Sequence, residues 1–256
     1  MIKKITLIVV LIIASIMLLW HIAQKKHTVT KRDKEFIIVG TNAEYPPFSF
    51  MKNDTIVGFD IDIAQEVANR LNKKMILRDM PFDTLIPEAQ IGSIQLIAAG
   101  ITTTKEREKN LLFTKPYISG DPLIIISMKS DNQHIKSIND LVGKKVVVNE
   151  GFIADFYMSE KKGIELIRLG TLSEGFLALK AGQVDAFVTA RNSAQPFFEK
   201  QGVDSFNIVP VEGTSDSYSL GISKKHPQLL EQVQKALHSM ETDNTIDTLK
   251  KKWNIQ

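Results

Sequence analysis

A run of threonines followed by an arginine is the strongest candidate for a binding site in this sequence. The segment GITTTKER, residues 100–107, comes directly after an apolar run, so a strand should end there and a helix should begin. Thr103 and Glu106 have the spacing of a capping box. Free N–H groups, the Thr102 hydroxyl and the Arg107 guanidinium would then converge on a small anion, and a carboxylate offers the guanidinium two oxygens. The alternative is an ordinary helix cap with a solvated arginine.

Three aromatic residues form a second candidate site. Tyr45 and Phe48 follow one expected strand, and Phe82 follows another. Ligands of open α/β sheets bind outside the carboxyl ends of the strands, so these rings could sandwich a ligand's side chain. The alternative is that they pack in the hydrophobic core.

Motifs for catalysis, cofactors and metals do not occur. The sequence has no GxSxG, GxGxxG, Walker loop or HExxH, and its five histidines are scattered. It has no cysteine, which excludes thiol chemistry, disulfides and an N-terminal lipid anchor. We therefore expect no cofactor, no metal site and no catalytic residue.

The net charge of +3 belongs to the N-terminus. Four lysines, at positions 3, 4, 25 and 26, flank an uncharged stretch, and without them the acids outnumber the basic residues by one. A nucleic-acid-binding protein needs a basic face, which this near-neutral body does not suggest.

The stretch Ile5–Ala23 is apolar and 19 residues long. As a helix it would measure roughly 28 Å, close to the thickness of a bilayer core. A signal peptide has a shorter core and a small-x-small cleavage site, whereas His21 stands near the end of this one. We favour an uncleaved membrane anchor over a cleaved signal peptide, and both interpretations predict that the chain is exported from the cytoplasm.

After the N-terminal segment, the sequence predicts alternating strands and helices, which is typical of an α/β fold. A first series runs to about residue 122, and a second starts near Ser137. Apolar strands bracket the second series, which suggests one lobe inserted into another. We expect an export segment at 1–27, a tether at 28–34, a first lobe at 35–122 and 224–256, a second lobe at 123–223, and hinge strands near 122–128 and 218–223.

Several motifs in one order resemble the periplasmic amino-acid-binding proteins that serve ABC importers, the polar amino-acid solute-binding family. They are FIIVGTNAEYPPF at 36–48, VGFDIDIA at 57–64, FDTLI at 82–86, AAGITTTKER at 98–107 and NTIDTLKKKW at 244–253. The resemblance covers nearly all of residues 35–256. It implies the two-lobed type II periplasmic-binding-protein fold, in which two α/β lobes joined by two hinge strands close on a ligand like a flytrap.

The resemblance also implies roles for individual residues of the first lobe. Tyr45 and Phe82 would form the two walls around the ligand's side chain, and Asn42 would reach its end. The Gly100 carbonyl would accept from the α-ammonium group, while Thr102 and Arg107 would clamp the α-carboxylate. Asp60 and Asp62 are interpreted as caps of the helix that follows.

The second lobe departs from the family's pattern. Gly151 is followed by Phe152 and Ile153 where hydroxyl residues are usual, so only backbone N–H groups would remain there for the carboxylate. Ala190 stands where the family has the aspartate that pairs with the α-ammonium group. Either the ligand lacks that group, or another acid replaces the aspartate; Glu44 and Glu150 are the candidates.

The expected function is therefore the extracytoplasmic substrate-binding component of an amino-acid ABC transporter, with a polar or basic amino acid as ligand. Its partners would be a permease and its ATPase, and its location the periplasm, with a tether to the inner membrane. A cyclohexadienyl-dehydratase-like lyase, with Glu44 or Glu150 as general acid, and a sensory input domain are the alternatives.

Overall fold

The computed structural model describes Met17, residues 35–131 and residues 135–255. The expected export segment, apart from Met17, and the expected tether lie outside these residues. None of the helices in the described ranges is long and apolar enough to cross a membrane.

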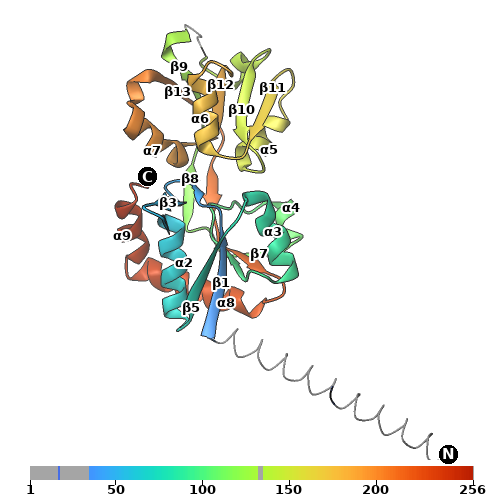
Figure 1. The fold of residues 1–256 in the computed structure, drawn as a ribbon, viewed down its shortest axis with the longest axis vertical. Helices are drawn as coiled ribbons and strands as arrows, with labels where there is room; N and C mark the ends of the chain where they lie inside the picture. The colour runs from blue at the N-terminus through green and yellow to red at the C-terminus, as the bar shows by residue number, and fades with distance from the viewer. Residues whose placement is uncertain (1–16, 18–34, 132–134, 256) are drawn as a thin grey trace, which may run out of the picture.

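The chain forms two α/β lobes stacked along the long axis of the molecule (Figure 1). The sheet of the first lobe has the order β5-β1-β6-β15-β7. The strand β1 pairs in parallel with β5 and β6, whereas β15 is antiparallel to β6 and β7. The bounds are β1 Phe36–Thr41, β5 Lys74–Asp79, β6 Leu96–Ile97, β7 Leu111–Phe113 and β15 Gly221–Ser223.

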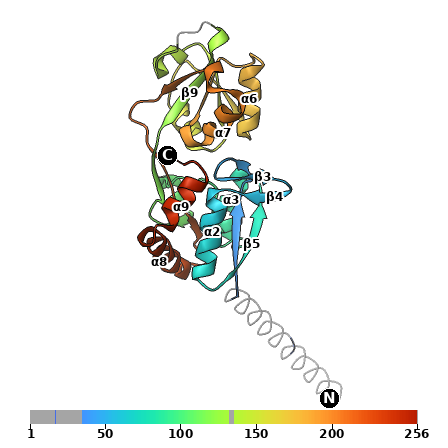
Figure 2. The same ribbon diagram turned by 90° about the vertical axis from the view of Figure 1, so that its left-hand side faces the viewer.

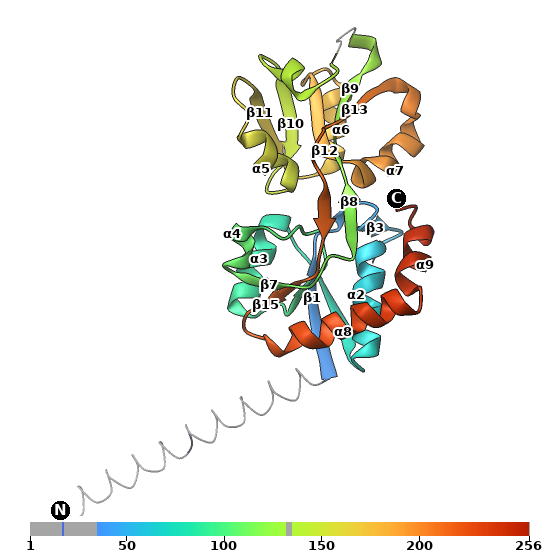
Figure 3. The same cartoon turned by 180° about the vertical axis from the view of Figure 1, so that it is seen from behind.

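Helices cover both faces of this sheet (Figures 1 and 3). One face packs against α2, α8 and α9, and the other against α3. A three-stranded sheet, β2-β3-β4, lies at the end of the lobe that faces the second lobe (Figure 2). The bounds are α2 Phe59–Arg70, α3 Phe82–Ile91, α4 Lys105–Glu108, α8 Gln228–Thr242, α9 Thr245–Lys252, β2 Glu44–Tyr45, β3 Ser49–Lys52 and β4 Thr55–Val57.

The second lobe repeats this plan with the sheet order β11-β10-β12-β9-β13. The strand β9, which lies between β12 and β13, is apolar on both faces: Leu123 and Ile125 pack with α5, while Ile124 and Ile126 pack with α6 and α7. Successive side chains of a strand point to opposite faces, so a continuous apolar run suits a sheet covered on both sides. The bounds are β9 Leu123–Met128, β10 Lys145–Asn149, β11 Glu165–Leu169, β12 Ala186–Ala190, β13 Phe206–Pro210, α5 Ile153–Ser159, α6 Leu172–Lys180 and α7 Arg191–Gln201, with 3₁₀ turns at Lys129–Asp131, Ile138–Leu141 and Val203–Ser205.

Two antiparallel strands, β8 (Ile118–Asp121) and β14 (Asp216–Tyr218), run between the lobes (Figure 3). The hinge expected near 122–128 is β9, a strand of the second lobe's sheet, and the hinge expected near 218–223 begins at the last residue of β14 and ends in β15, a strand of the first lobe's sheet. Each strand that connects the lobes therefore begins a few residues before the expected hinge. Residues 221–223, which were expected in the second lobe, are part of the first lobe's sheet. The strand β9 lies inside the second lobe because its apolar side chains are buried on both faces of that lobe's sheet.

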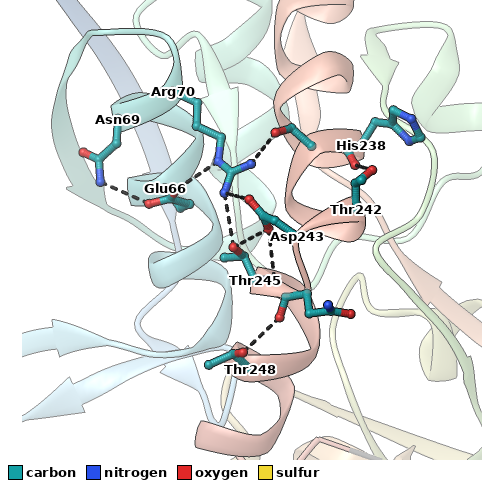
Figure 4. Close-up of polar contacts among 10 residues, drawn as sticks. Glu66, Asn69, Arg70, His238, Thr242, Asp243, Thr245 and Thr248 are labelled. Atoms are coloured by element: carbon teal, nitrogen blue, oxygen red, sulfur yellow. Dashed lines mark hydrogen bonds and ion pairs between the residues drawn. The ribbon is translucent and has the colours of Figure 1, made fainter.

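The C-terminal helices pack on the first lobe beside α2 (Figure 2). Arg70, in the last turn of α2, donates to Glu66 within its own helix, at 2.8 Å. It also donates to Ser239 at 2.6 Å, Asp243 at 2.7 Å and Thr245 at 3.1 Å (Figure 4). One guanidinium thereby ties the junction of α8 and α9 to α2. The expected two-lobed α/β architecture is confirmed.

Candidate ligand-binding site

The short helix α4 brings Arg107 to the cleft between the lobes. Thr104 is its N-cap, and the Thr104 hydroxyl accepts from the Arg107 backbone N–H at 3.2 Å. The expected capping box of Thr103 and Glu106 is therefore wrong: the N-cap is one residue later, and the Thr103 hydroxyl donates to that of Ser219 at 3.3 Å.

The Arg107 side chain is buried and joins the two lobes. Its Nη1 donates to the Thr102 carbonyl in the first lobe at 2.7 Å, and its Nη2 to the Gly151 carbonyl in the second lobe at 2.7 Å. The guanidinium carbon lies 5.4 Å from the centre of the Phe82 ring and 5.6 Å from that of Phe156. The interpretation as a solvated arginine is therefore wrong.

Burial lowers the pKa of Arg107 to about 10, and the nearby Asp216 carboxylate opposes that shift. The guanidinium still carries its charge at neutral pH. It has five N–H donors in total. Two of them bind backbone carbonyls of described residues, which leaves capacity for the two oxygens of a carboxylate.

Three aromatic rings stack across the cleft. Phe152, from the second lobe, lies between the two rings that the sequence suggested as walls. Its ring centre is 4.6 Å from that of Tyr45 and 4.1 Å from that of Phe82, with interplanar angles of 30° and 23°. The two rings predicted as walls therefore flank a ring of the protein itself, and their role towards a ligand stays a prediction. Phe48 also stacks on Tyr45, with ring centres 5.5 Å apart at an angle of 22°, and it is fully buried against Tyr218 and Phe59.

Gly100 forms the floor beneath Tyr45. A Cβ atom at this position would lie 2.7 Å from Cε1 of Tyr45, and the glycine has a φ of +59°. Its N–H donates to Oδ2 of Asp60 at 2.6 Å. Asp60 is fully buried, and this burial raises the pKa of its carboxyl group to about 6 against the opposing bond from Gly100.

The two aspartates of the VGFDIDIA motif are structural, as expected, but they do not cap α2. The N-cap position is Gly58, which offers no side chain. Asp60 holds Gly100, and Asp62 accepts from Nε1 of Trp253 at 2.6 Å and from Nζ of Lys252 at 2.7 Å. Their partners lie far along the chain, which local spacing could not show.

In the loop before α5, most of the N–H groups that we expected to bind a ligand donate to other atoms of the protein. The Gly151 N–H donates to Asp155 at 3.0 Å, and the Phe152 N–H to the Asn149 carbonyl at 3.2 Å. Ile153 is the first residue of α5 and is half-buried. The expectation that Gly151 and Phe152 offer free N–H groups to a carboxylate is therefore not met in this arrangement.

A pair of buried acids at the crossing strands was not foreseen from the sequence. Asp121 and Asp216 face each other in the register of β8 and β14. Asp121 accepts from the Tyr218 hydroxyl at 2.8 Å, and Asp216 from the Thr102 hydroxyl at 2.6 Å. Burial raises the pKa of both carboxyl groups, that of Asp216 to about 6.

Ala190 is buried at the end of β12, directly before α7.

An acidic pocket of about 440 Å³ opens beside Phe82. Among the residues that the structure describes, its charged lining consists of four exposed carboxylates, with no lysine or arginine. The buried Asn42 also lines it and donates to the Met80 carbonyl at 3.4 Å. Of the predicted residues, Asn42, Glu44, Phe82 and Glu150 meet here, and Asp79 and Asp83 are additions that the sequence interpretation missed.

Two α/β lobes, two crossing strands and a cleft that holds a buried guanidinium define the two-lobed class of solute-binding proteins. The model of the bacterial extracellular solute-binding proteins, family 3, matches residues 37–256. The chain belongs to this family, which confirms the resemblance carried by its motifs.

Individual relatives are similar over most of their length. The arginine-binding extracellular protein ArtP of Bacillus subtilis is 29% identical over 223 residues, which cover 86% of each chain. A probable histidine-binding protein of Campylobacter jejuni is 31% identical over 219 residues, covering 85% of this chain and 84% of that protein. The structure of an ancestral arginine-binding protein bound to arginine superposes with a TM-score of 0.80 at 36% identity, covering 85% of this chain and 97% of that one.

Proposed function

We propose that this chain is the substrate-binding component of an amino-acid ABC transporter and that its lobes close on an α-amino acid with a basic side chain. The observation that carries the proposal is the buried Arg107 guanidinium at the junction of the lobes, beside a pocket whose charged lining is entirely acidic. Arg107 would bind the α-carboxylate, and the acidic pocket would attract the cationic end of the side chain.

The relatives support this ligand class. One is named as arginine-binding and one as probably histidine-binding, and the ancestral protein was solved with arginine. In the proposed role the protein works in the periplasm, where the apolar segment Ile5–Ala23 would serve as export signal or inner-membrane tether. Its macromolecular partners would be a permease and its ATPase.

We favour binding over catalysis. Glu44 and Glu150, the two general acids considered for a lyase, both line the acidic pocket and are both exposed. A general acid that works near neutral pH usually has a pKa raised by burial. The named relatives are binding proteins.

A thermal-shift screen tests the proposal. The purified protein is heated with L-arginine, L-lysine, L-histidine, L-glutamine or L-glutamate. A ligand present at about 100 times its Kd adds roughly 2.7 kcal/mol of stability, so the basic amino acids should raise the midpoint by several degrees. L-Glutamate should not, because its side chain would face four carboxylates. The absence of a shift with every α-amino acid would overturn the proposal.

Replacing Phe152 with alanine should make the binding of L-arginine tighter by about tenfold. The ring must leave the space between Tyr45 and Phe82 before a ligand's side chain can enter it. Each aromatic pair contributes about 0.5–1.5 kcal/mol beyond its buried area, so the two stacks together oppose entry by roughly 1–3 kcal/mol. Isothermal titration calorimetry measures the change.

Phe156→Ala is the matched control for Phe152→Ala. The Phe156 ring is 48% exposed and also contacts Arg107, but no stacking on Tyr45 or Phe82 is found for it. Its removal should not tighten binding. Weaker binding in Phe152→Ala would mean that the ring is a wall of the site and does not compete for it.

A further inference from the structure

The floor of the cleft holds opposite charges on either side of one residue. The Thr102 carbonyl accepts from Arg107 at 2.7 Å, and the Thr102 hydroxyl donates to Oδ1 of Asp216 at 2.6 Å. Both charged side chains are buried. An α-amino acid carries its carboxylate and its ammonium group on a single carbon, so it needs a cation and an anion placed this close together.

We propose that Asp216 is the residue that binds the α-ammonium group of the ligand. The assignment rests on the proposed function, because it takes the ligand to be an α-amino acid whose carboxylate binds Arg107. Asp216 lies on a crossing strand, and no role follows for it from the motifs in the sequence.

The hydrogen bonds distinguish Asp216 from its neighbour Asp121. Asp121 accepts through both oxygens, from the Tyr218 hydroxyl at 2.8 Å and from the Asn192 N–H at 3.1 Å. Asp216 accepts two bonds from described residues, from Thr102 and from the Ser217 N–H at 2.8 Å, and both reach Oδ1. Oδ2 of Asp216 is therefore the atom with capacity for a new donor.

The charges around Asp216 favour an incoming cation. Arg107 on α4 is the cation whose charge acts on Asp216, while Asp121 on β8 adds a second negative charge beside it. The other titratable groups that face this pair are the neutral phenols of Tyr45 on β2 and Tyr218 on β14, and Arg191 on α7, which acts on Asp121. Two buried carboxyl groups thus share the cleft floor with one buried guanidinium.

Open space borders Asp216. A pocket of about 300 Å³ reaches it between α5 and the loop that leads into β14. Ile153 and Phe156 form its α5 side, and Phe156 also contacts the Arg107 guanidinium. An α-amino acid whose carboxylate and ammonium groups reached Arg107 and Asp216 would therefore lie against α5 at both groups.

The test compares L-arginine with 5-guanidinopentanoate, the same molecule without its α-ammonium group, by calorimetry at pH 7.5. The wild type should bind L-arginine at least ~30-fold more tightly, because removing one partner of a buried charge pair costs about 2–5 kcal/mol. In Asp216→Asn this preference should fall to within about threefold, through a loss of L-arginine affinity. Asparagine keeps the shape and can still accept from Thr102, so the hinge should stay folded.

Asp121→Asn is the matched control: it removes a neighbouring charge whose two oxygens already accept from Tyr218 and Asn192, so it should reduce the preference for L-arginine far less than Asp216→Asn does. A preference that persists in Asp216→Asn, or that disappears in Asp121→Asn instead, overturns the assignment to Asp216 while leaving the proposed function intact. A wild type that binds neither L-arginine nor any other α-amino acid overturns both.

The pH dependence of the wild type tests the same assignment if the variant does not fold. Protonation of Asp216 in the free protein, with a pKa of about 6, removes its charge, so the affinity for L-arginine should fall as the pH drops from 7.5 to 5. The affinity for 5-guanidinopentanoate should change much less, and any effect of Asp60 applies to both ligands. An equal pH dependence for the two ligands would contradict the role of Asp216.

Discussion

Arg107→Ala should weaken the binding of L-arginine by about 30-fold to several thousandfold, as measured by calorimetry. The range corresponds to about 2–5 kcal/mol, the usual cost of removing one partner of a buried, hydrogen-bonded charge pair. The guanidinium is 5% exposed, and it would face the ligand's carboxylate in a cleft from which most water is excluded. A ligand carboxylate buried without this partner would keep its desolvation cost and lose the compensating bonds.

Two further variants sharpen this experiment. Arg107→Lys keeps the positive charge but cannot hold two oxygens in a fixed fork, so it should recover only part of the affinity. Arg70→Ala removes a guanidinium that ties α2 to the C-terminal helices and lies outside the cleft, so it should lower the melting temperature and leave the affinity unchanged. Unchanged affinity in Arg107→Ala would contradict the carboxylate clamp.

Gly58→Ala should lower the free energy of unfolding by about 2–6 kcal/mol, the largest stability effect that we expect from a single methyl group. Gly58 has a φ of +145°, and a Cβ atom would lie 2.1 Å from the Phe48 carbonyl oxygen. That oxygen accepts from the Asp60 N–H at 2.9 Å, so the clash would break the contact that seats the start of α2. Backbone strain contributes about 1–3 kcal/mol and a broken buried hydrogen bond a similar amount.

Gly120→Ala is the control that separates strain from clash. Gly120 also has a positive φ, +88°, but a Cβ atom there would meet nothing within 4 Å. It should therefore cost only the strain of about 1–3 kcal/mol. Urea unfolding followed by circular dichroism measures both variants, and an equal loss in the two would contradict the steric argument at Gly58.

The elements with a clear apolar period were predictable from the sequence. The spacing of apolar residues predicts helices at 229–240 and 246–253, which the structure shows as α8 and α9, and an apolar run predicts a strand at 145–148, which lies within β10. The strand β13 and the helix α7 were missed. The segment of α7, RNSAQPFFEKQ, contains a proline and many polar residues, and it is helical because Ala194 and Phe198 pack into the core of the second lobe.

The candidate site was predictable where its residues lie in one segment. Thr102 and Arg107 are five positions apart, and their types alone suggested an anion site. Asp216 could not be assigned in this way, because the fold brings it to Thr102 across 114 positions of sequence. Phe152 was noticed as a departure from a pattern, but its place between Tyr45 and Phe82 depends on how the two lobes meet.

The central claim is that the cleft binds a basic α-amino acid through its carboxylate. The most direct measurement is a calorimetric titration of the purified protein with L-arginine and with agmatine, which keeps the amine and the guanidinium but lacks the carboxylate. We predict saturable binding of one L-arginine per chain and at least ~30-fold weaker binding of agmatine. Equal affinity for the two, or no binding of L-arginine, would contradict the claim.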